Sequence, residues 1–175
     1  IWPVWHWLQL PGTQFLAASV DINLALDFSR LSRRIVESPW FQSHYGEEFA
    51  LLPDENQARL YRNTKGGYRA TASVQGRVIG TGGDIQILDD PHDAKKVESD
   101  AIRQATLTWH DNSWRSRLND PRRAQKVYIG QRTHDMDIFG HVLEQEGKRW
   151  VNLVLPLEFD PKRICITYAN DGTGV

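Results

Sequence analysis

The chain has 175 residues, which is long enough for one domain with a sizeable core and too short for two large ones. Its 21 lysines and arginines against 22 aspartates and glutamates give a net charge of -1, so overall charge argues neither for nor against a polyanionic partner. The single cysteine, Cys165, excludes an intrachain disulfide, and no apolar run approaches the roughly 20 residues that span a bilayer. We therefore expect a soluble intracellular protein and, because the chain begins at Ile1 without a methionine, a piece of a longer one.

The first half of the chain predicts a buried helix end, a buried strand and a helix. IWPVWHWL is the helix end, and TQFLAASV, residues 13–20, is short and apolar and follows a Pro-Gly turn. Apolar residues then recur at spacings of four, three and four, which predicts an amphipathic helix that packs on the sheet. These residues are Leu24, Phe28, Leu31 and Ile35. Residues 63–84, with their glycine pairs, predict short antiparallel strands.

The second half predicts further strands that alternate with helices. IQIL, residues 85–88, is a buried strand, and helical composition runs from Ala94 to about Leu118 with Asp93 as a plausible N-cap. KVYIG, residues 126–130, is another strand, and a helix follows near residues 138–145. Apolar strands that alternate with amphipathic helices imply parallel pairing and right-handed crossovers. The fold class predicted is a three-layer α/β structure with a mostly parallel sheet.

Polar residues follow two of these strands directly. Asp89 and Asp90 come after IQIL, and Gln131, Arg132 and His134 come just after KVYIG. Ligands of such sheets bind beyond the carboxyl ends of the strands. The two polar clusters are therefore expected to share one site.

The acid pair has a functional and a structural interpretation. A carboxylate at the end of a buried strand is how nucleotide hydrolases hold Mg²⁺, which fits Asp89, and a neighbouring carboxylate can orient and deprotonate the attacking water, which fits Asp90. Asp-Asp-Pro also makes an ordinary turn that caps a helix. Because adjacent carboxylates repel each other, a cation between them is the first suspect.

The cluster QRTHDMDIFGH also has two interpretations. Read structurally, Thr133 or Asp135 caps the following helix, Asp137 favours its dipole, and His141 lies on a solvated face. Gln131 and Arg132 fit this interpretation less well, because their strand should lie beside the strand that carries the acid pair. They could sense or contact a phosphate.

Other features are given structural interpretations. No segment matches the phosphate-binding pattern G-x-x-x-x-G-K-[ST], so the glycines are read as hairpin and bulge residues. The seven tryptophans favour core packing over base stacking. One stretch is concentrated in basic residues, and solvated surface is favoured over contact with DNA. Its members are Arg115, Arg117, Arg122, Arg123 and Lys126.

Taken in order, five stretches resemble the large subunit of tailed-phage terminases, the ATP-driven motor that packages DNA into a procapsid. They are FLAASVDINLALDFSRLSRRIVESPWFQ, NTKGGYRATASVQGRVIGTGGDIQILDDP, WRSRLNDP, IGQRTHDMDIFGHVLE and WVNLVLPLEF. The resemblance covers nearly all of residues 11–159, and several motifs agree in order and spacing.

The resemblance implies a P-loop NTPase core of the ASCE type with ATP and Mg²⁺ as cofactors. Asp89 then holds the metal and contributes to nucleotide binding together with Asp90, which is also the catalytic base of a Walker B strand. Most such motors have glutamate where Asp90 stands. Gln131 and Arg132 match the segment that couples nucleotide state to movement. Ser19 is given no role beyond packing.

The resemblance also implies a domain plan, partners and a location. Residues 1–160 would be a partial ATPase domain, incomplete at its N-terminus because the Walker A segment is missing, and residues 161–175 would begin a connecting segment. The partners would be double-stranded DNA, the small terminase subunit and the portal protein, in a homo-oligomeric ring on the procapsid, with no membrane. The location would be the cytoplasm of an infected bacterial host. The chain alone is expected to be unable to hydrolyse ATP.

Two other functions compete with this one. A metal-dependent nuclease or phosphodiesterase could hold two ions with Asp89, Asp90 and Asp93, with His134 as a further candidate ligand. A non-catalytic interaction domain is favoured only by the missing P-loop. The DNA-binding residues are not identified by the sequence.

Overall fold

The computed structural model describes residues 1–78, 80, 82–156, 158 and 161. The chain divides into two compact units, Ile1–His141 and Val142–Val175, and the first contains the whole sheet. The predicted connecting segment from residue 161 onward lies almost wholly outside the described residues, as does Cys165. The expected domain boundary near residue 160 therefore stays a prediction.

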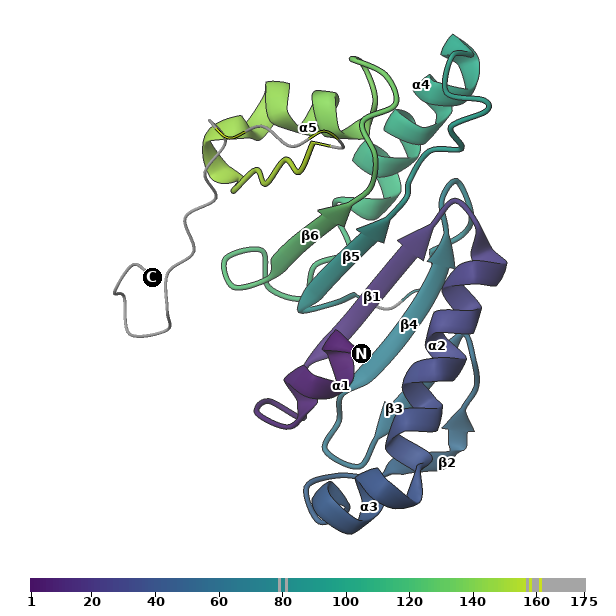
Figure 1. Cartoon of the computed structure of the whole chain (residues 1–175), viewed down its shortest axis with the longest axis vertical. Coiled ribbons are helices and arrows are strands. Elements are labelled where there is room, and N and C mark those ends of the chain that lie inside the picture. The colour runs from purple at the N-terminus through teal and green to yellow at the C-terminus, as the bar shows by residue number, and fades with distance from the viewer. Residues whose placement is uncertain (79, 81, 157, 159–160, 162–175) are drawn as a thin grey trace. The chain divides into compact units, whose positions relative to one another are not determined.

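The first unit is built on a six-stranded mixed sheet in the order β2-β3-β4-β1-β5-β6 (Figure 1). The strands are β1 (Gln14–Ser19), β2 (Leu51–Asn56), β3 (Leu60–Asn63), β4 (Tyr68–Ser73), β5 (Ile85–Asp89) and β6 (Gln125–Ile129). Strands β4, β1, β5 and β6 are parallel, while β2 and β3 join antiparallel. The mostly parallel sheet and the pairing of β5 with β6, the two strands followed by polar residues, are confirmed. The antiparallel strands predicted over residues 63–84 are misplaced: β2 and β3 end by Asn63, and β4, the full strand described within that range, pairs parallel with β1.

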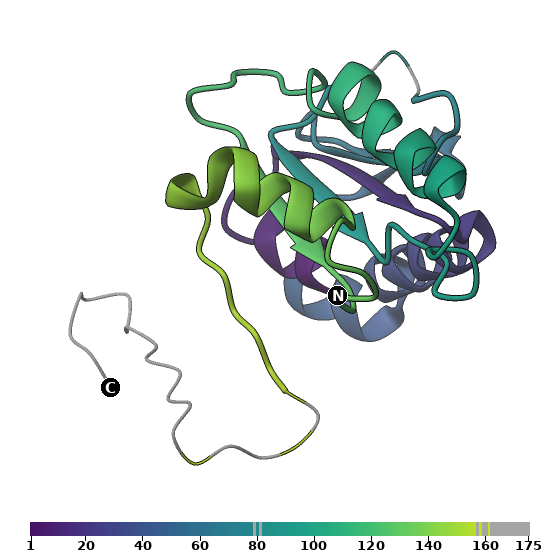
Figure 2. The same cartoon turned by 90° about the horizontal axis from the view of Figure 1, so that it is seen from above.

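Helices cover both faces of the sheet (Figure 2). One face carries α1 (Trp2–Trp7), α2 (Ile22–Glu37) and α3 (Pro39–Tyr45), and the other carries α4 (Asp100–Trp109), which continues as the π-helical turn η1 (His110–Trp114). The chain then forms α5 (Ile138–Glu146) and the 3-10 turn η2 (Gly147–Arg149). The α/β class with helices on both faces is thus as predicted. No described helix is both long and apolar enough to cross a bilayer.

The main core lies between the sheet and the α1–α3 side. Its aromatic centre is Trp7, which is fully buried and packs edge to face against Phe15, Phe49 and Tyr61. The indole N–H of Trp7 donates to the Thr13 carbonyl at 2.8 Å, so its one polar group is satisfied. The aromatic start of the chain therefore forms a helix, as expected, whose buried side, Pro3, Val4 and Trp7, packs on the core, while Trp5 is exposed.

The predicted inward face of α2 is wrong by one residue. Leu24, Phe28 and Leu31 are 42%, 43% and 52% exposed, whereas the buried positions are Ala25, Ser29, Ser32 and Val36. Both series have the spacing four, three, four, so periodicity alone does not choose between them. The sheet decides: Tyr61 and Arg69 are buried beneath the helix and fill the space, so α2 presents small side chains to them.

The predicted long helix from residue 94 is also corrected. Residues 94–98 form turns, and α4 begins only at Asp100, after Ser99. Asp93 accepts a hydrogen bond from the Lys95 N–H and pairs with the Lys96 amino group at 3.4 Å, so it caps a turn rather than the helix. After Trp109 the helix widens into η1, which ends at Trp114.

Candidate functional site

The carboxyl ends of β1, β5 and β6 lie side by side. Ser19 is paired with Asp89, and Asp89 with Ile129, so the residues after these strands emerge at one edge of the sheet. A pocket of about 230 Å³ opens there. Its lining residues come from the ends of the three strands and from the segments that follow them: Ser19, Val20, Asp21, Leu24, Asp90, Pro91, His92, Ala94, Gln131, Thr133 and Phe139. Of the two polar clusters predicted to share one site, the structure brings Asp90 and Gln131 to the lining of one pocket.

Asp90 is held at the centre of this edge by its backbone. Its N–H donates to the Ile129 carbonyl at 2.9 Å, and its carbonyl accepts from the Val20 N–H at 3.2 Å. Its φ of 42° lies in the left-handed region, which aspartate tolerates better than most residues but still at a cost. The carboxylate forms no hydrogen bond or ion pair with any described residue. The fold thus fixes the position of Asp90 and leaves its carboxylate available at the pocket.

Gly130 leaves room for this carboxylate. A Cβ at this position would lie 3.1 Å from Oδ1 of Asp90 and 2.9 Å from Cζ of Phe139. A side chain at residue 130 would therefore press on two residues that line the pocket.

Asp89 lies at the last position of β5 but does not line the pocket. Strand alternation places its side chain with Ile85 and Ile87 on the face that packs against α1 and α2. Burial and the neighbouring charge of Asp90 raise the pKa of Asp89, and the buried guanidinium of Arg69 opposes this shift. The predicted metal-ligand role of Asp89 stays a prediction, and Asp90 is the acid of the pair that faces the pocket.

His92 ties the acid-pair segment to the start of α5. Its Nε2 accepts a hydrogen bond from the Ile138 N–H at 2.9 Å, so the hydrogen of a neutral ring is on Nδ1. Burial lowers the pKa of His92, with Asp137 opposing and Arg103 and His134 adding to the shift. His92 therefore contributes a neutral imidazole to the pocket wall.

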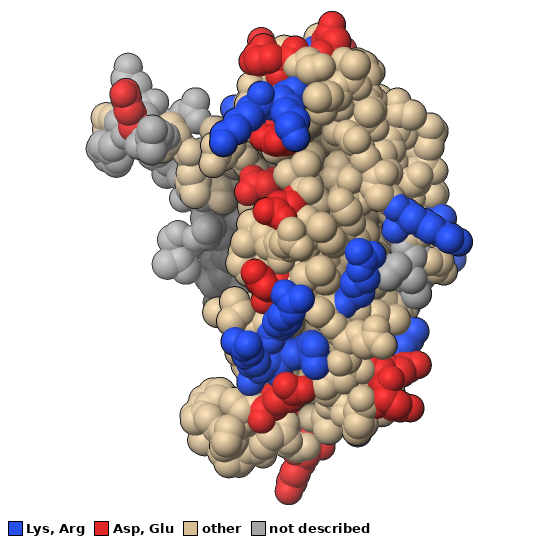
Figure 3. All heavy atoms as spheres, turned by 90° about the vertical axis from the view of Figure 1, so that its right-hand side faces the viewer, with Lys and Arg blue, Asp and Glu red and all other residues tan. Residues whose placement is uncertain are grey.

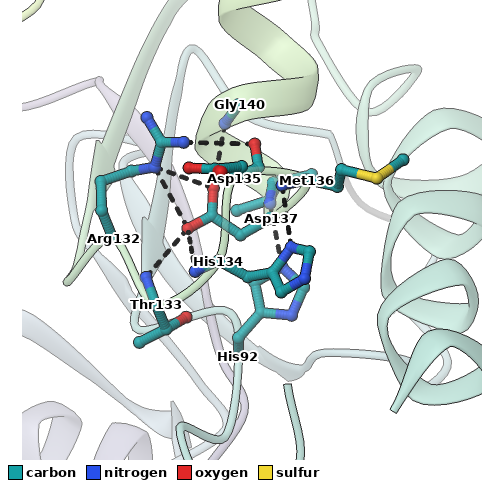
Figure 4. Close-up of polar contacts among 9 residues, drawn as sticks. His92, Arg132, Thr133, His134, Asp135, Met136, Asp137 and Gly140 are labelled. Atoms are coloured by element: carbon teal, nitrogen blue, oxygen red, sulfur yellow. Dashed lines mark hydrogen bonds and ion pairs between the residues drawn. The ribbon is translucent and has the colours of Figure 1, made fainter. Parts of the chain in front are cut away.

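Asp137 organises the loop after β6 (Figure 4). Its fully buried carboxylate accepts from the backbone N–H groups of Thr133, His134 and Gly140, and from the Arg132 Nε at 3.2 Å. Asp137 is thus the N-terminal cap of α5, so the prediction that Thr133 or Asp135 caps this helix is wrong. A buried carboxylate can accept several N–H groups at once, which suits it to fold the loop back on itself.

Arg132 and His134 are occupied by this loop. The Arg132 guanidinium bonds to Asp137 and to the Asp135 carbonyl, and neither Arg132 nor His134 lines the pocket. The His134 Nδ1 accepts from the Met136 N–H at 2.9 Å. Of the predicted phosphate-contacting residues, only Gln131 reaches the pocket.

The chemistry of the pocket favours a cation. Among the described residues that line it there is no lysine or arginine, while Asp21 and Asp90 are both acidic. The first amides of α2 are not free to bind a phosphate, because the Asp21 side chain already accepts from the N–H groups of Asn23 and Leu24. Carboxylate, hydroxyl and amide oxygens are the ligands that Mg²⁺ prefers, with water completing its shell. The edge could hold a hydrated Mg²⁺.

The ligand set of the nuclease alternative is not assembled in the described part of the chain. The Asp93 carboxylate accepts from the Lys95 N–H in the turn that follows it, and the His134 ring accepts from the Met136 N–H. The group of three convergent metal-ligating side chains found among the described residues is a different one, His110, Asp111 and His141. His141 is mostly buried and bonds to Asp111, so its predicted place on a solvated face is wrong.

On the face that Figure 3 shows, charge gives no clear DNA-binding surface. On the face shown in Figure 3, lysine and arginine side chains are interspersed with aspartate and glutamate rather than forming one continuous basic field. Within the basic stretch, Arg115, Arg122 and Arg123 are exposed. The DNA-binding residues therefore stay unassigned.

Several residues of the site were missed from the sequence. Ser19 was given only a packing role, yet it lines the pocket, and His92 was not singled out at all. The signal for His92 was its place directly after the acid pair and Pro91, in a segment bound to lie at the same edge.

In comparisons with known proteins, no family model matches the chain and no curated protein is significantly similar to it.

Proposed function

We propose that the carboxyl edge of β5 binds Mg²⁺ and activates water in a nucleotide hydrolase of the P-loop type. The observation that carries this proposal is the Asp90 carboxylate, which has no partner among the described residues and faces a pocket between the ends of β1 and β6. A carboxylate that the backbone fixes but leaves free can accept a proton from a bound water. Such a group is what in-line attack on a phosphorus requires.

The neighbouring residues take complementary roles in this proposal. The Ser19 hydroxyl and the Gln131 amide oxygen offer further ligands or orient the water. Asp89, which does not line the pocket, would assist from the strand end through a metal-bound water. Gln131 directly precedes Arg132, and Arg132 binds Asp137, the cap of α5. A shift of Gln131 on loss of phosphate would therefore move Arg132 and, through Asp137, the start of that helix. The loop after β6 would thereby couple nucleotide state to movement.

A phosphate-binding loop has to come from elsewhere under this proposal. The chain contains no P-loop motif, and the pocket offers acceptors rather than amide donors. In the described part of the chain, β6 is the last strand of the sheet. A further parallel strand beside β6 would bring a P-loop, which follows a strand and opens a helix, next to Asp90. The chain alone would then bind Mg²⁺ weakly and not hydrolyse ATP.

The wider biological setting rests on the resemblance to terminase large subunits. We place this edge in the ATPase motor of such a subunit, acting with double-stranded DNA, a small terminase subunit and a portal protein in the cytoplasm of an infected bacterium. The mostly parallel sheet with an acid pair at the end of a central strand is compatible with that setting. No described contact favours the nuclease alternative.

The test is ATP hydrolysis by the full-length protein that carries this chain, with and without DNA. Asp90→Asn keeps the side-chain shape and tolerates the left-handed backbone, so it removes the base alone. We expect turnover to fall about 100-fold or more with nucleotide binding retained. Asp93→Asn is the matched control, because this nearby acid caps an exposed turn, and its turnover should stay at the wild-type level. Equal turnover in wild type and Asp90→Asn would exclude the proposed role.

A further inference from the structure

A second polar cluster lies away from the pocket, where η1 meets the start of α5. The Asp111 carboxylate is bound on both sides: its Oδ1 lies 2.8 Å from Nδ1 of His110, and its Oδ2 lies 2.9 Å from Nε2 of His141. One ligand atom from each of the three residues lies within 4.8 Å of the other two. We propose that His110, Asp111 and His141 bind a divalent transition-metal ion of the zinc class.

The donor set fits this class of ion. Zinc takes imidazole nitrogens and carboxylate oxygens at about 2.0–2.2 Å, which puts tetrahedral ligand atoms about 3.3–3.6 Å apart. The His110 and His141 nitrogens already flank the same carboxylate, so rotations of the three side chains bring the donors to these separations. Mg²⁺ and Ca²⁺ prefer oxygen ligands, and two imidazoles select against them.

The outer contacts of the cluster resemble those of protein metal sites. The Nε2 of His110 lies 2.8 Å from the Tyr128 hydroxyl, so the ring nitrogen that faces away from Asp111 is held by a partner. Such a partner fixes the orientation of a ligating imidazole and its tautomer. The two imidazole planes are almost perpendicular, at 89°, with ring centroids 6.1 Å apart, so both nitrogens reach the carboxylate from different directions.

The burial of the three side chains leaves one open position. His110 is 5% exposed at its side chain, His141 18% and Asp111 35%. The ion would therefore be enclosed on the His110 side and accessible past Asp111, where water or an external ligand completes the shell. Three protein ligands with an open fourth position are typical of catalytic zinc sites.

The contacts within the cluster shift the pKa values of His110 and Asp111. Burial lowers the pKa of His110, with nearby His141 and Lys126 adding to the shift and Asp111 opposing it. Although burial alone would raise the pKa of Asp111, its hydrogen bonds to His110 and His141 lower it.

The local backbone brings these residues together. His110 and Asp111 open the π-helical turn η1, and His141 lies 30 residues later in α5. Single π-turns inside helices are often found at functional sites. A bound ion would cross-link η1 to the first turns of α5 and so restrain the loop that carries Gln131.

Calorimetric titration of Zn²⁺ into the metal-stripped chain tests this proposal. We expect one equivalent to bind, with at least a tenfold weaker affinity in His141→Ala and in Asp111→Asn. Tyr128→Phe, which removes a positioning contact, should weaken binding by about tenfold. His44→Ala is the matched control, because His44 is an exposed histidine on α3, and its affinity should equal that of wild type.

Two results would overturn the proposal: no saturable Zn²⁺ binding by wild type, or unchanged affinity in His141→Ala. If His141→Ala is less folded than wild type by circular dichroism in EDTA, crystals of the wild-type chain soaked in Zn²⁺ decide. An anomalous peak among the three side chains supports the site, and a peak elsewhere or none contradicts it. The ATPase test leaves this outcome unaffected, since no residue of the cluster lines the pocket.

Discussion

The polar segments after β5 and after β6 look alike in the sequence and differ in the structure. Each follows a parallel strand of the sheet, and each contains several charged side chains within a few residues of the strand end. After β6, Asp137 binds three backbone N–H groups and the Arg132 guanidinium, so its polar groups are consumed in folding the loop. After β5, the Asp90 carboxylate has no partner among the described residues.

At this edge of the sheet, one acid holds a loop in place and the other is left free to bind a ligand. A carboxylate that already accepts several hydrogen bonds has little capacity left for a metal or a water, whereas one held only through its backbone retains all of it. The loop after β6 therefore acts as a frame, whereas under the proposed function the reactive group would be the Asp90 carboxylate after β5. Three substitutions test this distinction by stability alone.

The largest effect is expected from Asp137→Ala. The substitution leaves the exposed Arg132 guanidinium, the loop amides and the first amides of α5 without the buried carboxylate that accepts from them, so the free energy of unfolding should fall by about 2–4 kcal/mol. Denaturant unfolding measures this change. The control is Asp135→Ala, an exposed neighbour, which should change stability by less than about 0.5 kcal/mol. Equal losses in the two variants would show that Asp137 is not the organising residue.

An intermediate effect is expected at Asp90. Its φ of 42° strains an ordinary side chain and suits glycine, so Asp90→Gly should be more stable than Asp90→Ala by about 1 kcal/mol. Both variants lack the carboxylate, so their difference isolates the backbone strain. Thermal unfolding of the two proteins in the same buffer provides the comparison. An alanine variant at least as stable as the glycine variant would argue against a strained, positioned Asp90.

The smallest effect is expected from Asp89→Asn, and it depends on pH. Burial and Asp90 raise the pKa of Asp89, so protonation favours the folded state. Its stabilising contribution is present below the unfolded pKa of about 4 and is lost as pH rises through the folded value. The permanently neutral Asp89→Asn should therefore unfold at about 1–2 °C higher than wild type at pH 7 and show no gain near pH 3, since Asp89 is only half-buried and solvent screens the effect.

Asp93→Asn is the control with the opposite sign. The Lys95 N–H lowers the pKa of Asp93, and Lys96 adds to the shift. Ionised Asp93 thus stabilises the fold above its unfolded pKa, and this contribution disappears as pH falls through the folded value. Asp93→Asn should melt below wild type at pH 7. If the melting temperatures of Asp89→Asn and Asp93→Asn change in the same direction at pH 7, repulsion from Asp90 is not what makes the ionised form of Asp89 unfavourable.

The residues at the sheet edge could be predicted from the sequence because they directly follow the strands in the chain. Parallel strands end at the same side, so residues directly after IQIL and KVYIG had to meet. What could not be predicted was which polar groups remain free. Whether a polar side chain stays free depends on which backbone N–H groups donate to it, as those of Thr133 and His134 donate to Asp137. The sequence does not show these contacts, because they are set by the path of the backbone.

The other failures have tertiary causes. On α2, two series of residues share the same spacing, and the buried Tyr61 and Arg69 select the one with small side chains. The cluster at η1 joins His110 and Asp111 to His141, 30 residues later, through a π-helical turn that composition does not indicate. Periodicity finds elements, whereas the choice between faces of one element belongs to the packed structure.

The most direct test of the account is to locate Mn²⁺, a paramagnetic substitute for Mg²⁺, by its broadening of amide signals in the ¹⁵N-labelled chain. We predict selective broadening at Val20, Asp90 and Gln131, which surround the free carboxylate, and its loss in Asp90→Asn. Broadening that spares these amides, or that persists in Asp90→Asn, would contradict the claim that the end of β5 is a cation-binding edge.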